Sequence, residues 1–338
     1  MDQIFNDAVN KLLSNLSNPH TVRQAELTYD TAALWTAIDD SGFADAWVLD
    51  VLTDSSLSWH DAFSLIVATG RYALPLPLGP TMYVRSLLGK NKINGCVTIS
   101  TQTLQDFNHP RGEVVAHAVP FGRVADWVAM NLNGKAWLLP TSKALHEGPA
   151  VHGSLQSRLH WISWPDEAVS LGGVKPLREV GAILWAGMMA GAMIAVLERT
   201  ISYANERSQF GKTIGKFQAI QQQLSQMTEH VHAVHIAAEM AFFHGAPSSF
   251  DPMMVALAKG RASQAVSLVT ATAHAVHGAM GITAEYPLHL WTRRLHEWRM
   301  DFGSEAMWQK LIGDSLLKNS SDSVLDYVLG HLSPEQSM

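Results

Sequence analysis

Cysteine is almost absent from this chain of 338 residues, in which Cys96 stands alone. One cysteine allows no disulfide within the chain and none of the cysteine spacings typical of metal sites. The N-terminal stretch MDQIFNDAVNKLLSNL has an acidic second residue and polar residues among its apolar ones, unlike a signal peptide. We therefore expect a reducing, cytoplasmic location.

Basic charge is also scarce. Lys and Arg number 24 against 30 Asp and Glu, which gives a formal net charge of −6. A nucleic-acid-binding protein normally carries an excess of Lys and Arg, so a nucleic-acid partner is not expected. With 47% hydrophobic residues, the chain can bury a large core and has the length of two or three domains.

One uncharged, apolar run raises the question of a membrane span: GAILWAGMMAGAMIAVL, at residues 181–197. Its 17 residues reach only the short limit for a membrane-spanning helix. Gly187 and Gly191 have the spacing that lets helices approach closely. The composition favours a helix buried on all sides in a protein core, and we predict no membrane span.

The chain divides by its hydrophobic pattern into three parts of an α+β fold. Residues 1–90 have helical spacing and predict a small N-terminal helical domain. Residues 91–166 contain short runs rich in β-forming residues and predict a middle antiparallel β-domain, a small barrel or sandwich. Asn133-Gly134 is the strongest hairpin signal in it. The expected strands are 96–100, 114–119, 127–131, 136–139 and 159–164.

Residues 167–338 predict a C-terminal four-helix bundle. The expected helices are 176–204, one that opens after Gly215, 252–277, and one that follows Pro287 and ends before Gly303. Asp251 before Pro252 predicts an N-cap followed by proline at the first helical position. Four long helices joined by short connections are typical of a bundle.

Two motifs in this last part carry the functional signal. The first is ERSQFGKTIGKFQAIQQQ at residues 206–223, and the second is AVHGAMGITAEYP at residues 275–287. In the first, an Arg leaves one helix, a Gly-flanked aromatic turn follows, and a new helix opens. Such a turn presents a guanidinium and free backbone N–H groups, which suit a phosphorylated ligand.

Taken together, the domain order and both motifs resemble the acyl-CoA dehydrogenase family of flavoproteins. The resemblance implies FAD between the β-domain and the bundle, with a Glu that removes the α-proton of an acyl-CoA while hydride passes to the flavin. Electrons then leave through an electron-transfer flavoprotein. Arg207, Gln209 and Phe210 match the residues that contact the FAD of a neighbouring subunit, and Gly278 and Gly281 match glycines near its adenine end.

The resemblance fails at the positions that would carry the chemistry. The run RRLHEWRMDFGSEA, counted from Arg293, puts Phe302 at the usual catalytic Glu. Gly181 stands at the alternative base position used by a minority of the family. Asp301 is one residue away from Phe302, but a one-residue shift on a helix turns a side chain by about 100°. Both base positions are thus empty, and Asp301 is a weak substitute.

The expected flavin contacts in the β-domain are also missing. The family's Trp-Ile-Thr strand aligns with Ala118-Val119-Pro120. Thr98 matches the Thr of a Thr-Glu-Pro turn, but Ile99 and Ser100 replace the Glu and the Pro. The second motif departs too, with Ala275 and Ala279 at a usual Gln and a usual Gly. No metal site is predicted, because the three clustered histidines do not share one helix face: His230, His232 and His235.

Three hypotheses follow. The leading one is a base-less subunit of a heteromeric acyl-CoA dehydrogenase, an α₂β₂ heterotetramer whose catalytic partner chain holds FAD and whose substrate is an acyl-CoA, by analogy a steroid side-chain CoA thioester. The second is a self-sufficient homotetrameric dehydrogenase with Asp301 as a relocated base. The third is a flavin-free interaction or scaffold protein of the same fold.

Overall fold

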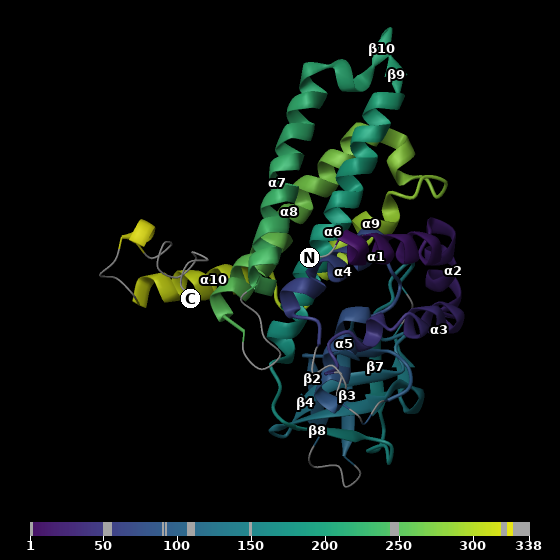
Figure 1. Cartoon of the computed structure of the whole chain (residues 1–338), viewed down its shortest axis with the longest axis vertical. Coiled ribbons are helices and arrows are strands. Elements are labelled where there is room, and N and C mark those ends of the chain that lie inside the picture. The colour runs from purple at the N-terminus through teal and green to yellow at the C-terminus, as the bar shows by residue number, and fades with distance from the viewer. Residues whose placement is uncertain are drawn as a thin grey trace.

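Three packed parts follow one another along the chain (Figure 1). The computed structural model describes residues 3–49, 56–89, 91, 93–106, 112–148, 151–243, 250–318 and 323–326. The first part is helical, as its pattern of apolar residues predicts. Its elements are α1 (Gln3–Leu16), α2 (Pro19–Thr28), α3 (Ala32–Asp40), the short η1 (Phe43–Asp45), α4 (Trp59–Arg71) and α5 (Leu78–Leu88).

The middle part is a β-sandwich of two four-stranded sheets. One sheet has the order β1-β4-β5-β8, with β1 (Val97–Ile99), β4 (Trp127–Leu132), β5 (Lys135–Pro140) and β8 (Val169–Gly173). The other has the order β2-β3-β7-β6, with β2 (Thr103–Asp106), β3 (Glu113–Val119), β7 (Ser157–Trp161) and β6 (Leu145–Glu147). Val114, Met130 and Trp161 belong to one buried cluster that joins strands of both sheets.

The predicted hairpin is confirmed, because Asn133 and Gly134 join β4 to β5 with φ of 53° and 71°. Both values are positive, as a two-residue turn of type I′ requires. The pairs within the sheets are antiparallel except β1 with β4, which is parallel.

The sequence does not predict three strands of the β-sandwich: β2, β6 and β8. β8 reads VSLGG, and its paired glycines resemble a turn more than a strand. It nevertheless pairs with β5, so the sheet continues to Gly173 and beyond the expected domain boundary at 166.

The third part contains the long helices α6 (Leu177–Glu206), α7 (Gln218–Phe243) and α8 (Pro252–His277). The predicted cap of α8 is confirmed, since the Asp251 side chain accepts a hydrogen bond from the Met253 N–H at 2.7 Å. The helix expected after Pro287 is present as α9 (His289–Trp298) and ends before Gly303 as predicted, but it has only 10 residues and is not a long bundle helix. Phe302 and Gly303 lie in the turn that follows, and both have positive φ, 58° and 115°. The chain then forms α10 (Glu305–Lys318), which the sequence does not predict.

Helix α6 is the core helix of the molecule. It is long and apolar enough to cross a membrane, but 94% of its most apolar window is buried inside the protein. A Cβ on Gly191 would overlap the backbone of Val67, so α4 packs there at the closest range that a glycine permits. This burial agrees with the expected core helix. The segment Pro252–Ile282 passes the same test of length and composition with 44% buried.

Helix α9 ties the three parts together through buried charge. Glu26 on α2 accepts hydrogen bonds from Arg293 at 2.9 Å and from Arg294 at 3.2 Å. The side chains of Glu26 and Arg294 are only 6% and 5% exposed. Arg294 also donates to the backbone oxygen of Ala73, and Arg293 to that of His152 before β7. One carboxylate therefore balances two guanidinium groups that anchor α9 to both other parts.

We expect Glu26→Gln to lower the free energy of unfolding by about 3–5 kcal/mol, because it leaves buried guanidinium charge without its counter-ion. The matched control is Glu198→Gln. Glu198 pairs with Arg71, but both side chains are 40% exposed or more, so its loss should cost less than about 1 kcal/mol. Thermal unfolding followed by circular dichroism measures both. Equal shifts of the two variants would show that the buried pair does not hold α9 in place.

Candidate functional site

The first motif forms the tip of the hairpin between α6 and α7. Strands β9 (Ser208–Gln209) and β10 (Lys212–Thr213) pair as a short antiparallel ribbon. Phe210 and Gly211 make the turn with φ of 53° and 80°, and Phe210 is 91% exposed. A bulky residue with positive φ is strained, and a bare aromatic ring on a tip is costly in water. Both features indicate a contact made by this tip.

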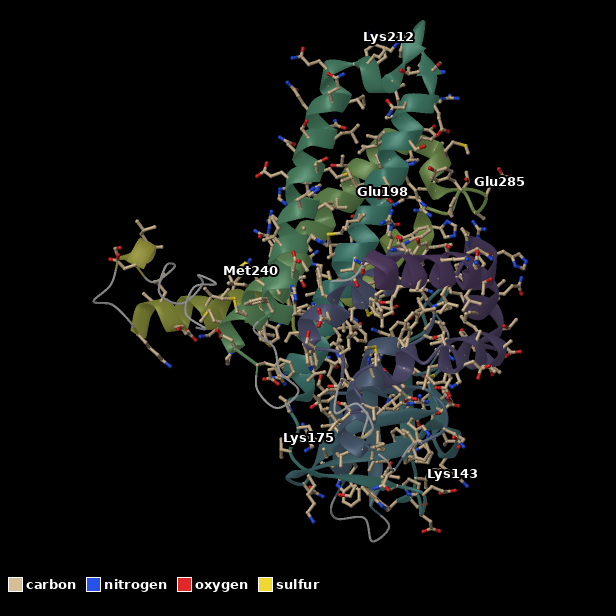
Figure 2. The ribbon with its side chains drawn as sticks, in the orientation of Figure 1. Lys143, Lys175, Glu198, Lys212, Met240 and Glu285 are labelled. Carbon is tan, nitrogen blue, oxygen red and sulfur yellow. The ribbon has the colours of Figure 1, made fainter. Side chains whose placement is uncertain are left out.

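Arg207, Gln209 and Phe210 are all exposed, and the Phe210 ring meets the Phe217 ring edge-on at a centroid distance of 6.2 Å. Arg207 and Gln209 are exposed, and the Gln209 amide donates only to the neighbouring Ser208 oxygen. Figure 1 shows β9 and β10 at one end of the long axis and the β-sandwich at the other. Figure 2 shows the labelled Lys212 at the same tip.

The length of α6 quantifies this separation. From Gly181 to Arg207 the chain is helical, and at 1.5 Å per residue that span is roughly 40 Å. Arg207 therefore cannot contact a ligand seated against this chain's own β-domain.

The second motif lies beside α6 and contacts it through His277. The Nδ1–H of His277 donates to the Ala273 oxygen at 2.7 Å, which leaves Nε2 to accept the Tyr286 hydroxyl at 3.1 Å. Tyr203 on α6 stacks on the imidazole with a centroid distance of 4.5 Å. Burial lowers the pKa of His277, which favours the neutral ring that this arrangement needs. His277 therefore has a structural role in the loop.

The two glycines of this loop differ in surroundings. Gly278 begins η4 (Gly278–Ile282) with φ 58° and ψ −140°, is exposed, and has nothing within 4 Å of where a Cβ would stand. A ligand can approach that backbone directly. Gly281 is buried, and a Cβ there would lie 2.9 Å from the His277 Cβ. Packing explains Gly281, and its predicted cofactor contact stays a prediction.

The two empty base positions meet in space. Phe302 is buried with 4% exposure, and its ring fills the volume beside Gly181 so closely that any Cβ at 181 would overlap it. Trp185 packs edge-on against the same ring at 4.7 Å. The sequence places Phe302 and Gly181 at two separate base positions and does not predict that they touch. A large residue at one position and a glycine at the other are the only hint of this contact in the sequence.

Asp301 is buried, and both of its carboxylate oxygens are engaged. The Gln156 amide donates to Oδ1 at 2.8 Å, and the Trp185 indole N–H donates to Oδ2 at 3.0 Å. The side chain is 7% exposed, and burial together with nearby Glu297 raises its pKa to about 8. Asp301 thus joins the β-domain to α6 and has no free oxygen to present to a substrate.

Lys259 on α8 completes this buried network. Its ammonium donates to the Ser263 hydroxyl at 2.8 Å and to the backbone oxygens of Arg299 and Gly303 at 3.0 and 3.2 Å. Burial lowers the pKa of Lys259 to about 8, against the opposing effect of Asp301. The two hydrogen bonds to Arg299 and Gly303 hold the turn that carries Phe302.

The expected flavin cradle of this chain is occupied by its own contacts. Thr98 is fully buried, and its hydroxyl donates to the Pro120 oxygen at 2.5 Å. Ala118, in the stretch expected to align with Trp-Ile-Thr, and Phe121 just after it both have positive φ. The Thr98 hydroxyl is therefore not free to bond a flavin, and the expected strand is irregular. Both observations argue against a flavin ring held by this chain alone.

Within the part of the chain that the structure describes, no group of three or more His, Cys, Asp or Glu side chains could hold a metal ion. Of the three clustered histidines, His235 packs its ring on Phe63 at 5.2 Å, and His232 bonds the Thr228 oxygen at 2.9 Å.

Comparison with known proteins shows what the chain is similar to. The acyl-CoA dehydrogenase C-terminal domain matches residues 179–317. Acyl-CoA dehydrogenase IpdE2 of Mycolicibacterium smegmatis is 27% identical over 303 residues, which cover 87% of this chain and 92% of the relative.

Two solved structures share the fold. The ChsE4–ChsE5 complex from Mycobacterium tuberculosis aligns with a TM-score of 0.79 at 18% identity, over 93% of this chain and 96% of that one. The Tcur3481–Tcur3483 steroid ACAD G363A variant aligns with a TM-score of 0.78 at 19% identity, over 94% and 98%. Residues 179–317 thus match the C-terminal domain of acyl-CoA dehydrogenases in sequence, and nearly the whole chain has the acyl-CoA dehydrogenase fold.

Proposed function

We propose that this chain is the base-less subunit of a heteromeric, FAD-dependent acyl-CoA dehydrogenase. It extends Arg207, Gln209, Phe210 and the Gly278 loop to FAD held with a second, catalytic chain. The observation that carries the proposal is the separation of the two halves of the expected site. The hairpin that carries Arg207 is exposed at one end of α6. The packed contact of Phe302 with Gly181, here called the closed centre, lies at the other end.

The exposed residues fit a dinucleotide phosphate. The planar guanidinium of Arg207 can fork onto two phosphate oxygens. The bare backbone at Gly278 admits a ligand at close range, and the Phe210 ring offers an apolar face. FAD, once bound, accepts the hydride from the β-carbon of the thioester. This chain's own part is to hold the cofactor's phosphates and to close the joint between subunits.

The catalytic Glu would come from the partner, because Phe302 and Gly181 cannot move a proton. An α₂β₂ heterotetramer is supported by the likeness to the ChsE4–ChsE5 complex, and a steroid side-chain CoA thioester by the likeness to a steroid ACAD. An electron-transfer flavoprotein is the proposed acceptor of the electrons. The cytoplasmic location stays a prediction.

The two alternatives have less support. A self-sufficient enzyme that uses Asp301 would need a carboxylate open to substrate, but Asp301 is buried and doubly hydrogen-bonded. A flavin-free scaffold would give no reason for a strained, exposed Phe210 next to an exposed Arg207.

Arg207→Ala should raise the dissociation constant of FAD in the reconstituted complex about ten- to a hundredfold, because a charge-assisted hydrogen bond contributes about 1.5–3 kcal/mol. The matched control is Lys212→Ala on the same hairpin, whose ammonium lies 4.3 Å from the Phe217 ring centroid. It should change FAD affinity less than twofold. Fluorescence titration measures both, and equal affinities of the two variants would remove Arg207 from the site.

Purified alone, the chain should carry far less than one FAD per chain in its visible absorption spectrum. Stoichiometric FAD together with acyl-CoA oxidation by the lone chain would overturn the proposal.

Asp301→Asn keeps the size of the side chain and one acceptor, so the complex with its partner should keep its turnover within about threefold. A loss of a thousandfold would instead identify Asp301 as a base.

Gly181→Ala should destabilise the chain by about 1–3 kcal/mol, the usual cost of overpacking a core. That cost should vanish when Phe302→Ala is present, because the ring then no longer fills the space. The control is Gly313→Ala on α10, where nothing lies within 4 Å and a Cβ should be neutral or stabilising. If Gly181→Ala lowers the free energy of unfolding equally with Phe302 and with Phe302→Ala, the Phe302 ring does not fill the space beside Gly181.

A further inference from the structure

A cleft lies between helices α1, α4 and α7, on a part of the molecule that the proposed function does not use. It measures ≈ 370 Å³, which is within the range of small-molecule sites. Helix α4 packs against both α1 and α7, and each of the three helices supplies residues to the walls (Figure 1). Arg207, Gly278, Gly181 and Phe302 do not line it.

The walls of this cleft combine apolar and polar side chains. Phe63, Val67 and Ala68 of α4 form the apolar part. The polar residues come from all three helices: Asn6 and Asn10 of α1, His60, Ser64 and Arg71 of α4, and His235 and Glu239 of α7. Such a lining suits a small molecule with an apolar body and one polar end.

The charges in the walls do not balance. The Arg71 guanidinium is already paired, because it donates to both carboxylate oxygens of Glu198 at 2.9 and 3.0 Å. Glu239 is half-buried, and its carboxylate forms no salt bridge or hydrogen bond with any residue that the structure describes. One negative charge is therefore left to attract a cation into the cleft.

Two further polar atoms of the lining residues lack a partner. The Asn6 side-chain oxygen and the His235 Nδ1 are buried, and neither forms a hydrogen bond within the described residues. Burial lowers the pKa of His235 in spite of the opposing effect of Glu239, so the ring is neutral at pH 7 and one of its nitrogens can accept a hydrogen bond. Since buried polar atoms normally have a partner, these two indicate a ligand that donates hydrogen bonds.

The Phe63 ring lies beside these acceptors. It packs on the His235 ring at a centroid distance of 5.2 Å. An aromatic ring attracts a cation through its face and also contacts apolar groups. Among the described residues no three His, Cys, Asp or Glu side chains come close enough to hold a metal ion, so the lining favours an organic cation.

We propose that this cleft binds a small organic ammonium ion with an apolar body. The ammonium group donates to the Glu239 carboxylate and to the Asn6 oxygen, and the apolar body lies against Phe63 and Val67. A primary ammonium has one positive charge and three N–H donors, which match one unbalanced carboxylate and the unpaired acceptors. The site does not depend on the proposed function, since its residues belong neither to the hairpin nor to the closed centre.

Binding is tested by isothermal titration calorimetry on the full chain at pH 7, with phenethylamine as the ligand. Phenethyl alcohol has the same shape without the charge, and phenylacetate has the opposite charge. Each should bind at least about tenfold more weakly, because neither can form the charge-assisted hydrogen bond to Glu239. Putrescine should also bind more weakly, because its second ammonium group finds no second unpaired carboxylate.

Glu239→Gln keeps the size of the side chain and removes its charge, so it should weaken phenethylamine binding about ten- to a hundredfold. Asn6→Asp adds a second carboxylate of equal size and should tighten binding about threefold or more. The matched control is Glu229→Gln, since Glu229 is exposed on α7 and does not line the cleft. This control should leave the affinity unchanged.

Arg207→Ala should not alter the affinity for phenethylamine, which separates this test from that of the proposed function. Variants are compared only when their melting temperatures match that of the parent. Failure of phenethylamine to bind, equal binding of phenethyl alcohol, or equal affinities of the Glu239→Gln variant and the parent would overturn the proposal.

Discussion

The contact between the Phe302 ring and the bare backbone at Gly181 is the constraint on which the functional interpretation depends. It joins the turn before α10 to the core helix at the place where an enzyme of this family needs a carboxylate and open space. Because the glycine leaves room and the ring fills it, neither position can regain an acid by one substitution without a clash or a cavity. The centre is closed by packing as well as by the loss of a functional group.

Buried charge supports this packing. Lys259 holds the backbone of the turn from one side, while Asp301 is held by Gln156 and Trp185 from the other. In an apolar core such groups are costly unless each is hydrogen-bonded, and here each is. Together with the clasp of Glu26 by Arg293 and Arg294, they bind the β-sandwich and the N-terminal helices to the bundle. These fixed contacts between the three parts argue against a cleft that opens and closes around a flavin.

Much of the fold follows from local signals in the sequence. The Asp251 cap, the Asn133-Gly134 turn and the uncharged, apolar composition of α6 are local signals, and each prediction is confirmed. The end of α9 before Gly303 also follows from the sequence, whereas α10 and the positive φ of Phe302 do not. Strand β8 is not predicted because its paired glycines are typical of a turn, and only the pairing with β5 makes the segment a strand. The meeting of Phe302 with Gly181 joins residues far apart in the chain, and no local pattern encodes it.

On the proposed function, helix α6 explains how one chain can keep half of a site and lose the other. Over about 45 Å, as expected for its 30 residues, it separates the exposed hairpin at Arg207 from the contact of Phe302 with Gly181. The two ends can therefore change independently, since a substitution at Gly181 does not alter the geometry of Arg207. A subunit that contacts only its neighbour's cofactor needs a rigid rod with an exposed tip, and the buried, glycine-spaced face of α6 against α4 supplies that rigidity.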